Sequence, residues 1–236
     1  MAGLLAGMLD LALPRECGGC DVVGTSWCGR CDDELSRAPL SLRPRVDPGV
    51  PCWALGPYSG PRRGAVLALK ERNRHDLARP LGVALAAAVR TLRMLGHIDP
   101  PELGRLVLVP APTRVRAARS RGGDPVRRFA SAAAESLEPE LVSVPSVLRM
   151  GRGVRDSVGL GAAARAENVA GHVQFVRPSR RRREPNGDAG YVSAASEPTV
   201  LLVDDVLTTG ATASESVCVL AEFGIRVDGV VVIAAV

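Results

Sequence analysis

An apolar run that leads directly into two acids constrains this chain more than any other feature. Residues 199–203 predict a fully buried strand, and Asp204 and Asp205 follow it. Strands of this kind are typical of parallel sheets with helices on both faces, where ligands bind at the carboxyl ends of the strands. The segment therefore predicts an α/β fold with two carboxylates at its ligand-binding edge.

The helix expected after these acids supplies the second half of a site. We expect it over 212–223, with Thr212 and Glu215 as a capping box and Gly224 as its end. Unpaired N–H groups and a partial positive charge make a helix N-terminus suitable for an anion. Because the two carboxylates would repel a phosphate, they suit sugar hydroxyls, so a phosphorylated sugar satisfies both halves. Thr208, Thr209 and Thr212 add hydroxyl donors for a phosphate, and Gly210 lets the backbone approach it closely.

Two other interpretations fit an apolar strand that ends in acids. A nucleotide hydrolase would also need a G-x-x-x-x-G-K-[ST] loop. The sequence excludes this loop, since its sole lysine is Lys70, in Leu69-Lys70-Glu71. A structural strand–turn–helix with surface acids stays open. The sequence also leaves open whether an ammonium is needed at position 70 or stands there by chance.

The rest of the chain alternates strand-like and helix-like segments, which predicts a parallel sheet with helices on both faces. Asp124 and Pro125 are the expected N-cap and first residue of one helix, which runs to about Leu137. This domain is expected to span 51–236, with 178–198 as a surface insertion. The expected strands lie at 52–58, 106–109, 142–148 and 172–176, and the other helices at 62–72, 76–95 and near 160–169.

Four cysteines near the N-terminus predict a metal site. Cys17-x-x-Cys20 and Cys28-x-x-Cys31 are two knuckles that can together offer four thiolates to one zinc ion. Four thiolates leave no open coordination position, so the predicted zinc is structural. A redox dithiol and disulfides are the alternatives, and an intracellular setting disfavours lasting disulfides. With a short apolar helix expected over 2–13, these knuckles define an N-terminal unit over 1–50.

Composition limits the class of protein. Of the 236 residues, 46% are hydrophobic and 23% charged, which excludes wholesale disorder, and the net charge is +5. The longest apolar stretches, such as 81–89, reach about half a membrane span, so no membrane partner is expected. The N-terminus has Asp10 within its apolar stretch and no basic residue before Arg15, which argues against a signal peptide. We therefore expect a cytoplasmic protein.

These motifs resemble one family. The segment VLLVDDVLTTGAT is similar to the phosphoribosyl-pyrophosphate (PRPP) loop of type I phosphoribosyltransferases, and a four-cysteine knuckle before such a domain resembles the ComF/GntX family. The segments at 67–78, 109–122 and 157–168 are similar to the family's LK…LA, V-P-x-P…R-G and Q-x-x-L…R-x-x-N stretches. The chain departs from the family in having Ser157 where glutamine is frequent, and Gly123-Asp124-Pro125 where the family often reads F-N-Q.

The resemblance implies a type I phosphoribosyltransferase fold and a transferase (a glycosyltransferase) of nucleoside metabolism. Such an enzyme binds PRPP with Mg²⁺, transfers the phosphoribosyl group to an acceptor and releases pyrophosphate. Asp204 and Asp205 would hold the ribose hydroxyls and metal-bound water. The 5-phosphate would be held by the turn of Thr208, Thr209, Gly210, Ala211 and Thr212. The backbone N–H groups of Ala111 and Thr113 would hold pyrophosphate. The acceptor stays open.

Two non-enzymatic functions also stay open. The resemblance implies a DNA-uptake or recombination adaptor, because ComF proteins are linked to competence through a helicase partner and single-stranded DNA. Residues 105–128 carry seven arginines against one aspartate, which suits pyrophosphate or a nucleic-acid backbone; a solvated basic face is the alternative. The basic run at 180–183 is expected to be a charged loop. A PRPP sensor that binds without turnover is the third possibility.

Overall fold

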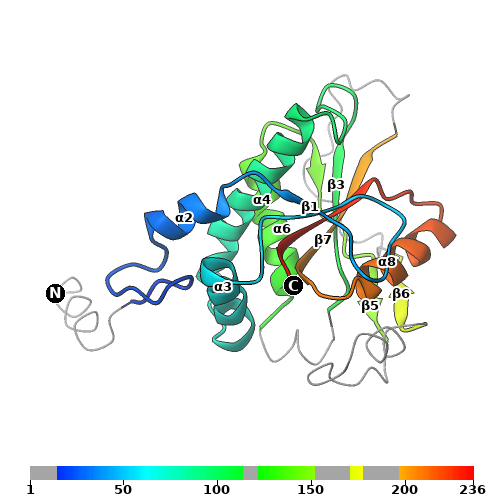
Figure 1. The fold of residues 1–236 in the computed structure, drawn as a ribbon. Helices are drawn as coiled ribbons and strands as arrows, with labels where there is room; N and C mark the ends of the chain where they lie inside the picture. The colour runs from blue at the N-terminus through cyan, green and yellow to red at the C-terminus, as the bar shows by residue number, and fades with distance from the viewer. Residues whose placement is uncertain (1–14, 114–121, 152–170, 178–196) are drawn as a thin grey trace.

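A computed structural model describes residues 15–113, 122–151, 171–177 and 197–236 of the chain (Figure 1). The helices expected over 2–13 and near 160–169 lie outside the described residues, as does nearly all of the insertion expected at 178–198. The basic run at 180–183 lies outside them as well.

A six-stranded sheet forms the centre of the described structure. Its neighbouring strands are parallel except for the first pair, β1 and β2, which is antiparallel. This arrangement confirms the predicted α/β architecture with a mostly parallel sheet. In spatial order the strands are β1 (Leu40–Leu42), β2 (Cys52–Ala54), β8 (Gly229–Ala235), β7 (Thr199–Leu207), β3 (Leu106–Pro110) and β4 (Val142–Ser143).

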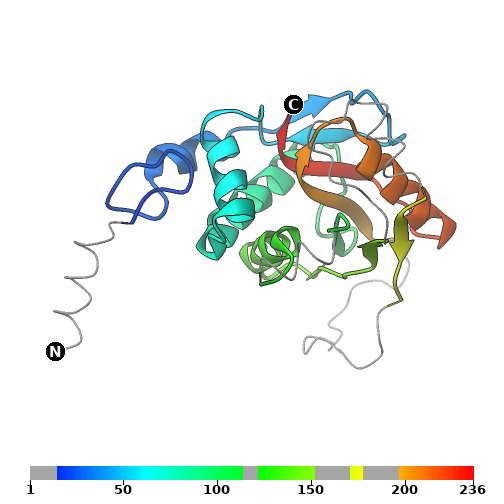
Figure 2. The same ribbon diagram turned by 90° about the horizontal axis from the view of Figure 1, so that it is seen from below.

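Helices flank both faces of this sheet (Figure 2). One face carries α3 (Gly60–Glu71), α4 (Ala78–Met94) and α6 (Pro125–Ser136), and the other carries α8 (Ala211–Glu222). The short helix α2 (Gly29–Leu35) belongs to the cysteine segment and packs on α3 and α4, and η1 (His75–Leu77) joins those two helices. None of the helices in these described ranges is long and apolar enough to cross a membrane.

The strands β5 (Leu148–Met150) and β6 (Val173–Phe175) form a separate antiparallel hairpin beside α8. Of the strand predicted over 142–148, only Val142 and Ser143 join the main sheet. The interruption has a local cause: Pro145 has no N–H to donate to a strand ladder.

Two separate cores explain why the central strands are almost entirely apolar. In β7, Leu201 and Val203 pack into the core under α3, α4 and α6, whereas Val200 and Leu202 pack into the core under α8. Successive side chains of a strand point to opposite faces, so a strand covered on both sides needs apolar residues at every position. Asp204 and Asp205 end this apolar run.

Replacing Gly82 with alanine is expected to destabilise the fold, although alanine is the better helix former. Gly82 lies where α4 crosses α6, and a Cβ there would stand 2.5 Å from the Cβ of Ala132 and 2.7 Å from the backbone of Phe129 and Ala133. Overpacking of this kind costs about 1–3 kcal/mol. Urea unfolding of Gly82→Ala should show this loss. The exposed neighbour offers a control, since Val83→Ala should change the unfolding free energy by less than about 0.5 kcal/mol.

Candidate functional site

The two acids lie within β7 rather than after it, which corrects the predicted end of this strand. β7 continues to Leu207 because β8 runs beside it, with Asp204 opposite Val232 and Leu207 opposite Ala235. The pairing therefore carries the strand past the point where its apolar pattern stops. The acids still lie toward the carboxyl end, where parallel sheets bind ligands.

Asp205 faces the side of the sheet covered by α3, because it follows the same alternation as Leu201 and Val203. Its residue surface is only 6% exposed. The Asp205 N–H donates a hydrogen bond of 2.8 Å to Asp204 Oδ1, which fixes the neighbouring carboxylate against the strand. Both acids are thus held by the backbone and the sheet, rather than projecting from a loop.

An ion pair joins Asp205 to Lys70. Lys70 lies in the last turn of α3, and its Nζ is 2.7 Å from Asp205 Oδ2. The lysine side chain is 29% exposed and the aspartate side chain 8%, so the pair lies at the edge of the core. Sequence reasoning did not find this partner. The only signal was that Lys70 is the one lysine among 30 basic residues.

A third carboxylate, Asp124, belongs to the same cluster. It caps α6 as predicted, accepting hydrogen bonds from the N–H groups of Val126 and Arg127, and Thr113 Oγ1 donates to it at 3.0 Å. Burial, and then the nearby charge of Asp205, raise the pKa of Asp124. Three carboxylates and one ammonium therefore interact at this edge of the sheet.

The predicted pyrophosphate contacts at Ala111 and Thr113 look different in the structure. The Ala111 N–H donates to the Val203 carbonyl at 2.8 Å, so this amide extends the ladder between β3 and β7. Because this N–H group already has a partner, it does not offer a free donor to pyrophosphate. Thr113 lies beside the carboxylates through its hydrogen bond to Asp124. Residues 114–121 of the same loop, with four of its seven arginines, lie outside the described residues.

The loop predicted to bind phosphate is tightly built. Gly210 is the N-cap of α8 with a φ of +92°, and a Cβ there would stand 2.2 Å from the Val46 carbonyl oxygen. Val46 N–H donates to the Thr209 carbonyl at 2.8 Å, and Ala211 N–H donates to Thr209 Oγ1 at 3.3 Å. Only glycine fits this position, for both its backbone angle and its close approach to residue 46. Thr208 is exposed at the start of the turn.

The capping box predicted for this helix is wrong. α8 begins at Ala211, so Thr212 lies inside its first turn, and the N-cap makes no side-chain hydrogen bond. Glu215 Oε1 instead accepts a hydrogen bond of 2.7 Å from the Gly171 N–H, next to β6. The end of the helix is as predicted, because Gly224 has a φ of +74° and donates to the Ala221 carbonyl.

The unfolding free energy is expected to fall between about pH 4 and pH 8 because of Asp204. Burial, and then the charge of Asp205, raise the pKa of Asp204 to about 8, with Lys70 opposing them. In the unfolded chain the same group titrates near pH 4. Between these values the folded state keeps a proton that the unfolded state releases, so stability falls by up to about 1.4 kcal/mol per pH unit.

Asp204→Asn removes this titration and supplies the test. Urea unfolding of both proteins should show the variant gaining stability relative to the wild type as the pH rises from 5 to 8. A difference that stays constant over this range would contradict the raised pKa.

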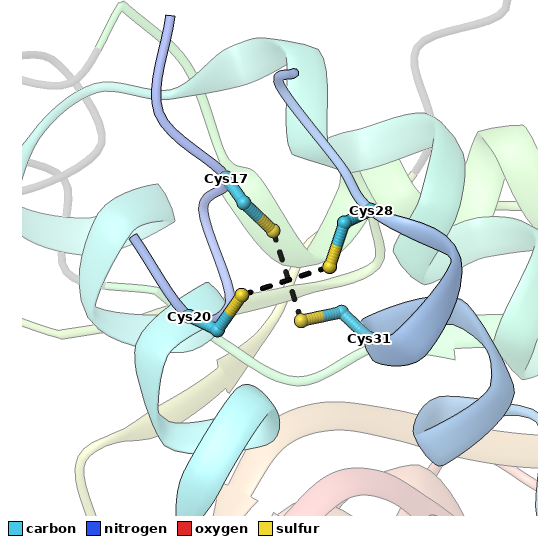
Figure 3. Close-up of side chains that lie close together, drawn as sticks. All are labelled: Cys17, Cys20, Cys28 and Cys31. Atoms are coloured by element: carbon cyan, nitrogen blue, oxygen red, sulfur yellow. Dashed lines mark hydrogen bonds between the residues drawn. The ribbon is translucent and has the colours of Figure 1, made fainter. Parts of the chain in front are cut away.

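The four cysteines form a second site (Figure 3). The Sγ atoms of Cys17, Cys20, Cys28 and Cys31 point toward a common centre and all lie within 4.8 Å of one another. The Sγ atoms are 3.7 Å apart for Cys17 and Cys31, and 3.6 Å apart for Cys20 and Cys28. A tetrahedral zinc with Zn–S bonds of about 2.3 Å requires sulfur atoms about 3.8 Å apart. The cluster can therefore hold a metal ion such as zinc.

The electrostatics of these thiols also suit a metal. A hydrogen bond from the Val22 backbone is the main cause that lowers the pKa of Cys20, to about 6. Burial, and then its cysteine neighbours, raise the pKa of Cys31. Four thiolates this close repel one another, and a cation at their centre relieves that repulsion.

The cysteine segment is joined to the rest of the molecule in two ways. α2 packs on α3 and α4, and β1, which follows it, pairs with β2 of the main sheet. The unit expected over 1–50 therefore contributes a strand to the sheet of the second domain. A hollow of about 510 Å³ lies beside the cysteine segment, and its charges are largely paired, Arg72 with Asp21 and Arg74 with Asp76.

Comparison with protein-family models gives no match, and comparison with curated proteins gives none either. The geometry and chemistry of the carboxylate cluster and the cysteine cluster are therefore the basis for assigning a function.

Proposed function

We propose that this chain is a phosphoribosyltransferase of the ComF/GntX type, which binds PRPP with Mg²⁺ at the Asp204–Asp205 edge of the sheet. The observation that carries the proposal is the strand–turn–helix unit of β7 and α8. It combines two adjacent carboxylates with a glycine-capped helix N-terminus at the carboxyl end of a parallel sheet. In this proposal the fold is that of the type I phosphoribosyltransferases.

The carboxylates suit the ribose of such a ligand. Vicinal hydroxyls offer two donors at the spacing of one sugar ring, and both acids have acceptors for them: the carboxylate of Asp205, paired with Lys70, and a carboxyl oxygen of Asp204, which accepts even when the group holds its proton. Asp205 is held between the strand and Lys70, so it is already oriented before a ligand arrives. A pre-oriented acceptor loses less entropy on binding than a free side chain.

The turn before α8 suits a 5-phosphate. Gly210 caps the helix and seats the turn against residue 46, the helix N-terminus carries partial positive charge, and Thr208 and Thr212 add hydroxyl donors. Thr209 instead holds the turn in shape, through Ala211 and Val46. In this proposal Thr209 and Gly210 are therefore structural residues of the phosphate turn.

The ligand's diphosphate would bring Mg²⁺, a cation that prefers oxygen ligands and retains several waters. Asp204 and Asp205 are oxygen donors of the right kind for its waters. The metal would stabilise the negative charge that develops on the leaving pyrophosphate. The chain's own residues bind and orient the ribose, so catalysis would rest on positioning and charge.

We further propose that the metal of the cysteine cluster is zinc in a structural role. All four ligands are thiolates of the chain, so such a zinc has no open position for water or substrate. In this proposal the cysteine cluster stabilises the fold, and the Asp204–Asp205 edge of the sheet binds the ligand.

Calorimetric titration of Mg-PRPP into zinc-loaded protein tests the proposed ligand. We expect one site, with Asp205→Asn weakening binding by about 100-fold, since a hydrogen bond to a charged group contributes about 1.5–3 kcal/mol. Asp99→Asn is the matched control, because it makes the same change at an exposed carboxylate and should bind normally.

Three outcomes of this titration separate the candidate functions. Binding followed by acceptor-dependent pyrophosphate release supports the transferase. Binding without release for any acceptor would make the chain a PRPP sensor. Absence of binding by folded, zinc-loaded protein would overturn both, and would leave the DNA-uptake adaptor with a single-stranded DNA partner as the function to test.

A further inference from the structure

We propose that α3 couples the four-cysteine cluster to the carboxylate site, and that Lys70 is the positioning residue through which this coupling acts. The first half of α3 packs on the cysteine segment, and its last turn carries Lys70 to Asp205. The part of the inference that concerns PRPP rests on the proposed function. The coupling between the cysteine cluster and Lys70 does not.

A backbone contact seats α3 on the first cysteine knuckle. Gly64 faces Gly19, which lies between Cys17 and Cys20, and a Cβ on Gly64 would stand 2.2 Å from the Gly19 carbonyl oxygen. Gly19 in turn packs against Cys31, whose Sγ would lie 2.8 Å from a Cβ at position 19. The helix therefore touches the metal-binding loop directly, with no side chain between them to absorb a shift.

Two arginines fasten the ends of α3 to the same segment. Arg62, in the first turn, donates to Glu34 Oε1 at 2.9 Å and to the Glu34 carbonyl in α2. Arg74, just beyond the last turn, donates to the Glu16 carbonyl at 2.9 Å and the Ser26 carbonyl at 3.2 Å. These carbonyls lie next to Cys17 and close to Cys28, so both knuckles are tied to α3 or to the turn that follows it.

Lys70 transmits the position of this helix to the ligand site. Its ammonium is 2.7 Å from Asp205 Oδ2, and charge-assisted hydrogen bonds weaken quickly when the atoms move apart. The charge of Lys70 also acts on Asp204, and Asp124 interacts in turn with Asp205. A small shift of α3 therefore changes both the orientation of Asp205 and the balance of charge around it.

A bound metal would hold in place the cysteine segment on which α3 packs. A tetrathiolate metal ties the Cys17–Cys20 loop to Cys28 and the first turn of α2. Without it, the thiols make only weak contacts with one another, and the loop that contains Gly19 is held less firmly, by the hydrogen bond from the Gly18 N–H to the Ser26 carbonyl at 3.0 Å and by Arg74. By linkage, a ligand that fixes Lys70 and Asp205 must then tighten metal binding by the same factor by which the metal tightens ligand binding.

The single lysine of the chain makes the coupling measurable without any ligand. Protein labelled with ¹³C,¹⁵N-lysine gives one side-chain nitrogen signal, that of Lys70 Nζ. We expect this signal to differ between zinc-loaded and chelator-treated protein, and to move in the direction seen in the Asp205→Asn variant. An unchanged signal in chelated protein that stays folded would overturn the coupling.

A pair of glycine variants tests the contact with the metal kept in place. Gly64→Ala forces α3 away from the Gly19 carbonyl, and we expect the Lys70 signal to shift at full zinc occupancy. Gly29→Ala is the matched control, because a Cβ there meets nothing within 4 Å and the signal should stay in place.

If chelation unfolds the chain, the comparison of Gly64→Ala with Gly29→Ala is by itself the test of the coupling. If Gly64→Ala does not fold, Glu34→Gln loosens the Arg62 pair without added bulk and should shift the signal in the same direction. Equal signals in wild type and in the folded variant would contradict the proposal.

Titration with Mg-PRPP separates this inference from the proposed function. We expect Lys70→Met to weaken binding by at least about tenfold and Lys70→Arg to restore part of the loss, because the arginine keeps the positive charge. We also expect Gly64→Ala to weaken binding while Gly29→Ala does not. A Lys70 signal that responds to zinc in a protein that binds no PRPP would leave the coupling standing and overturn only the proposed ligand. Normal PRPP affinity in Lys70→Met would overturn the positioning role.

Discussion

Cys17→Ser is expected to weaken zinc binding by about 100- to 1,000-fold. Cys17 is fully buried, and its Sγ is one of four that face a common centre. A serine hydroxyl does not ionise near neutral pH, so Cys17→Ser removes one of four anionic ligands. Structural zinc sites contribute about 10–16 kcal/mol in small zinc-binding domains, so losing one ligand in four costs about 2.5–4 kcal/mol. Competition with a chromophoric chelator measures the change in affinity.

Cys218→Ser is the control for this loss. Cys218 is the exposed cysteine of α8, on the other face of the sheet, and replacing it leaves the cluster intact. The control should bind one zinc per chain with unchanged affinity. If Cys17→Ser also bound one zinc as tightly as the wild type, the four thiols would not be a metal site. The closeness of the four cysteines would then be a result of packing alone.

The features predicted correctly from the sequence depend on short stretches of chain. The spacing of two C-x-x-C pairs fixes which thiols can meet, and the structure brings these four together. Asp124 followed by Pro125 identifies the start of a helix because the capping hydrogen bonds reach only two or three residues along the chain. The apolar run before Asp204 identifies a buried parallel strand for a similar reason, since burial on both faces leaves no polar position.

The features that the sequence did not reveal depend on contacts between distant segments. Lys70 and Asp205 are far apart in the chain and meet only because α3 covers the face of the sheet on which Asp205 lies. The end of β7 is set by its partner strand rather than by its own residues, so the strand runs past its acids. Glu215 matches a capping box locally but is taken by the Gly171 N–H beside the hairpin of β5 and β6. In each case a tertiary partner outweighs a local preference.

Removing the guanidinium of Arg62 is expected to lower the unfolding free energy by about 2–4 kcal/mol. Arg62 is 3% exposed and donates to three acceptors, the Leu55 carbonyl, Glu34 Oε1 and the Glu34 carbonyl. Breaking a buried ion pair typically costs about 3–5 kcal/mol, because the remaining partner stays desolvated. Glu34 is partly exposed, so water offsets some of this cost.

The neighbouring residue gives a control of equal size and charge. Arg63 is exposed on the same turn of α3, and Arg63→Ala should change the unfolding free energy by less than about 0.5 kcal/mol. Urea unfolding of zinc-loaded proteins measures both variants. Similar losses in the two would show that the charge of α3 matters and the buried contacts do not.

Arg62→Lys separates the geometry of this contact from its charge. One ammonium cannot reach three acceptors that surround a planar guanidinium, so lysine should recover only part of the lost stability. The site is shaped for arginine, because a Cβ on Gly56 would stand 2.4 Å from its Cζ. Because Arg62 joins α2 and Leu55, the residue after β2, to α3, a loss in Arg62→Ala that lysine only partly restores would identify this guanidinium as a link that holds the cysteine segment against the sheet.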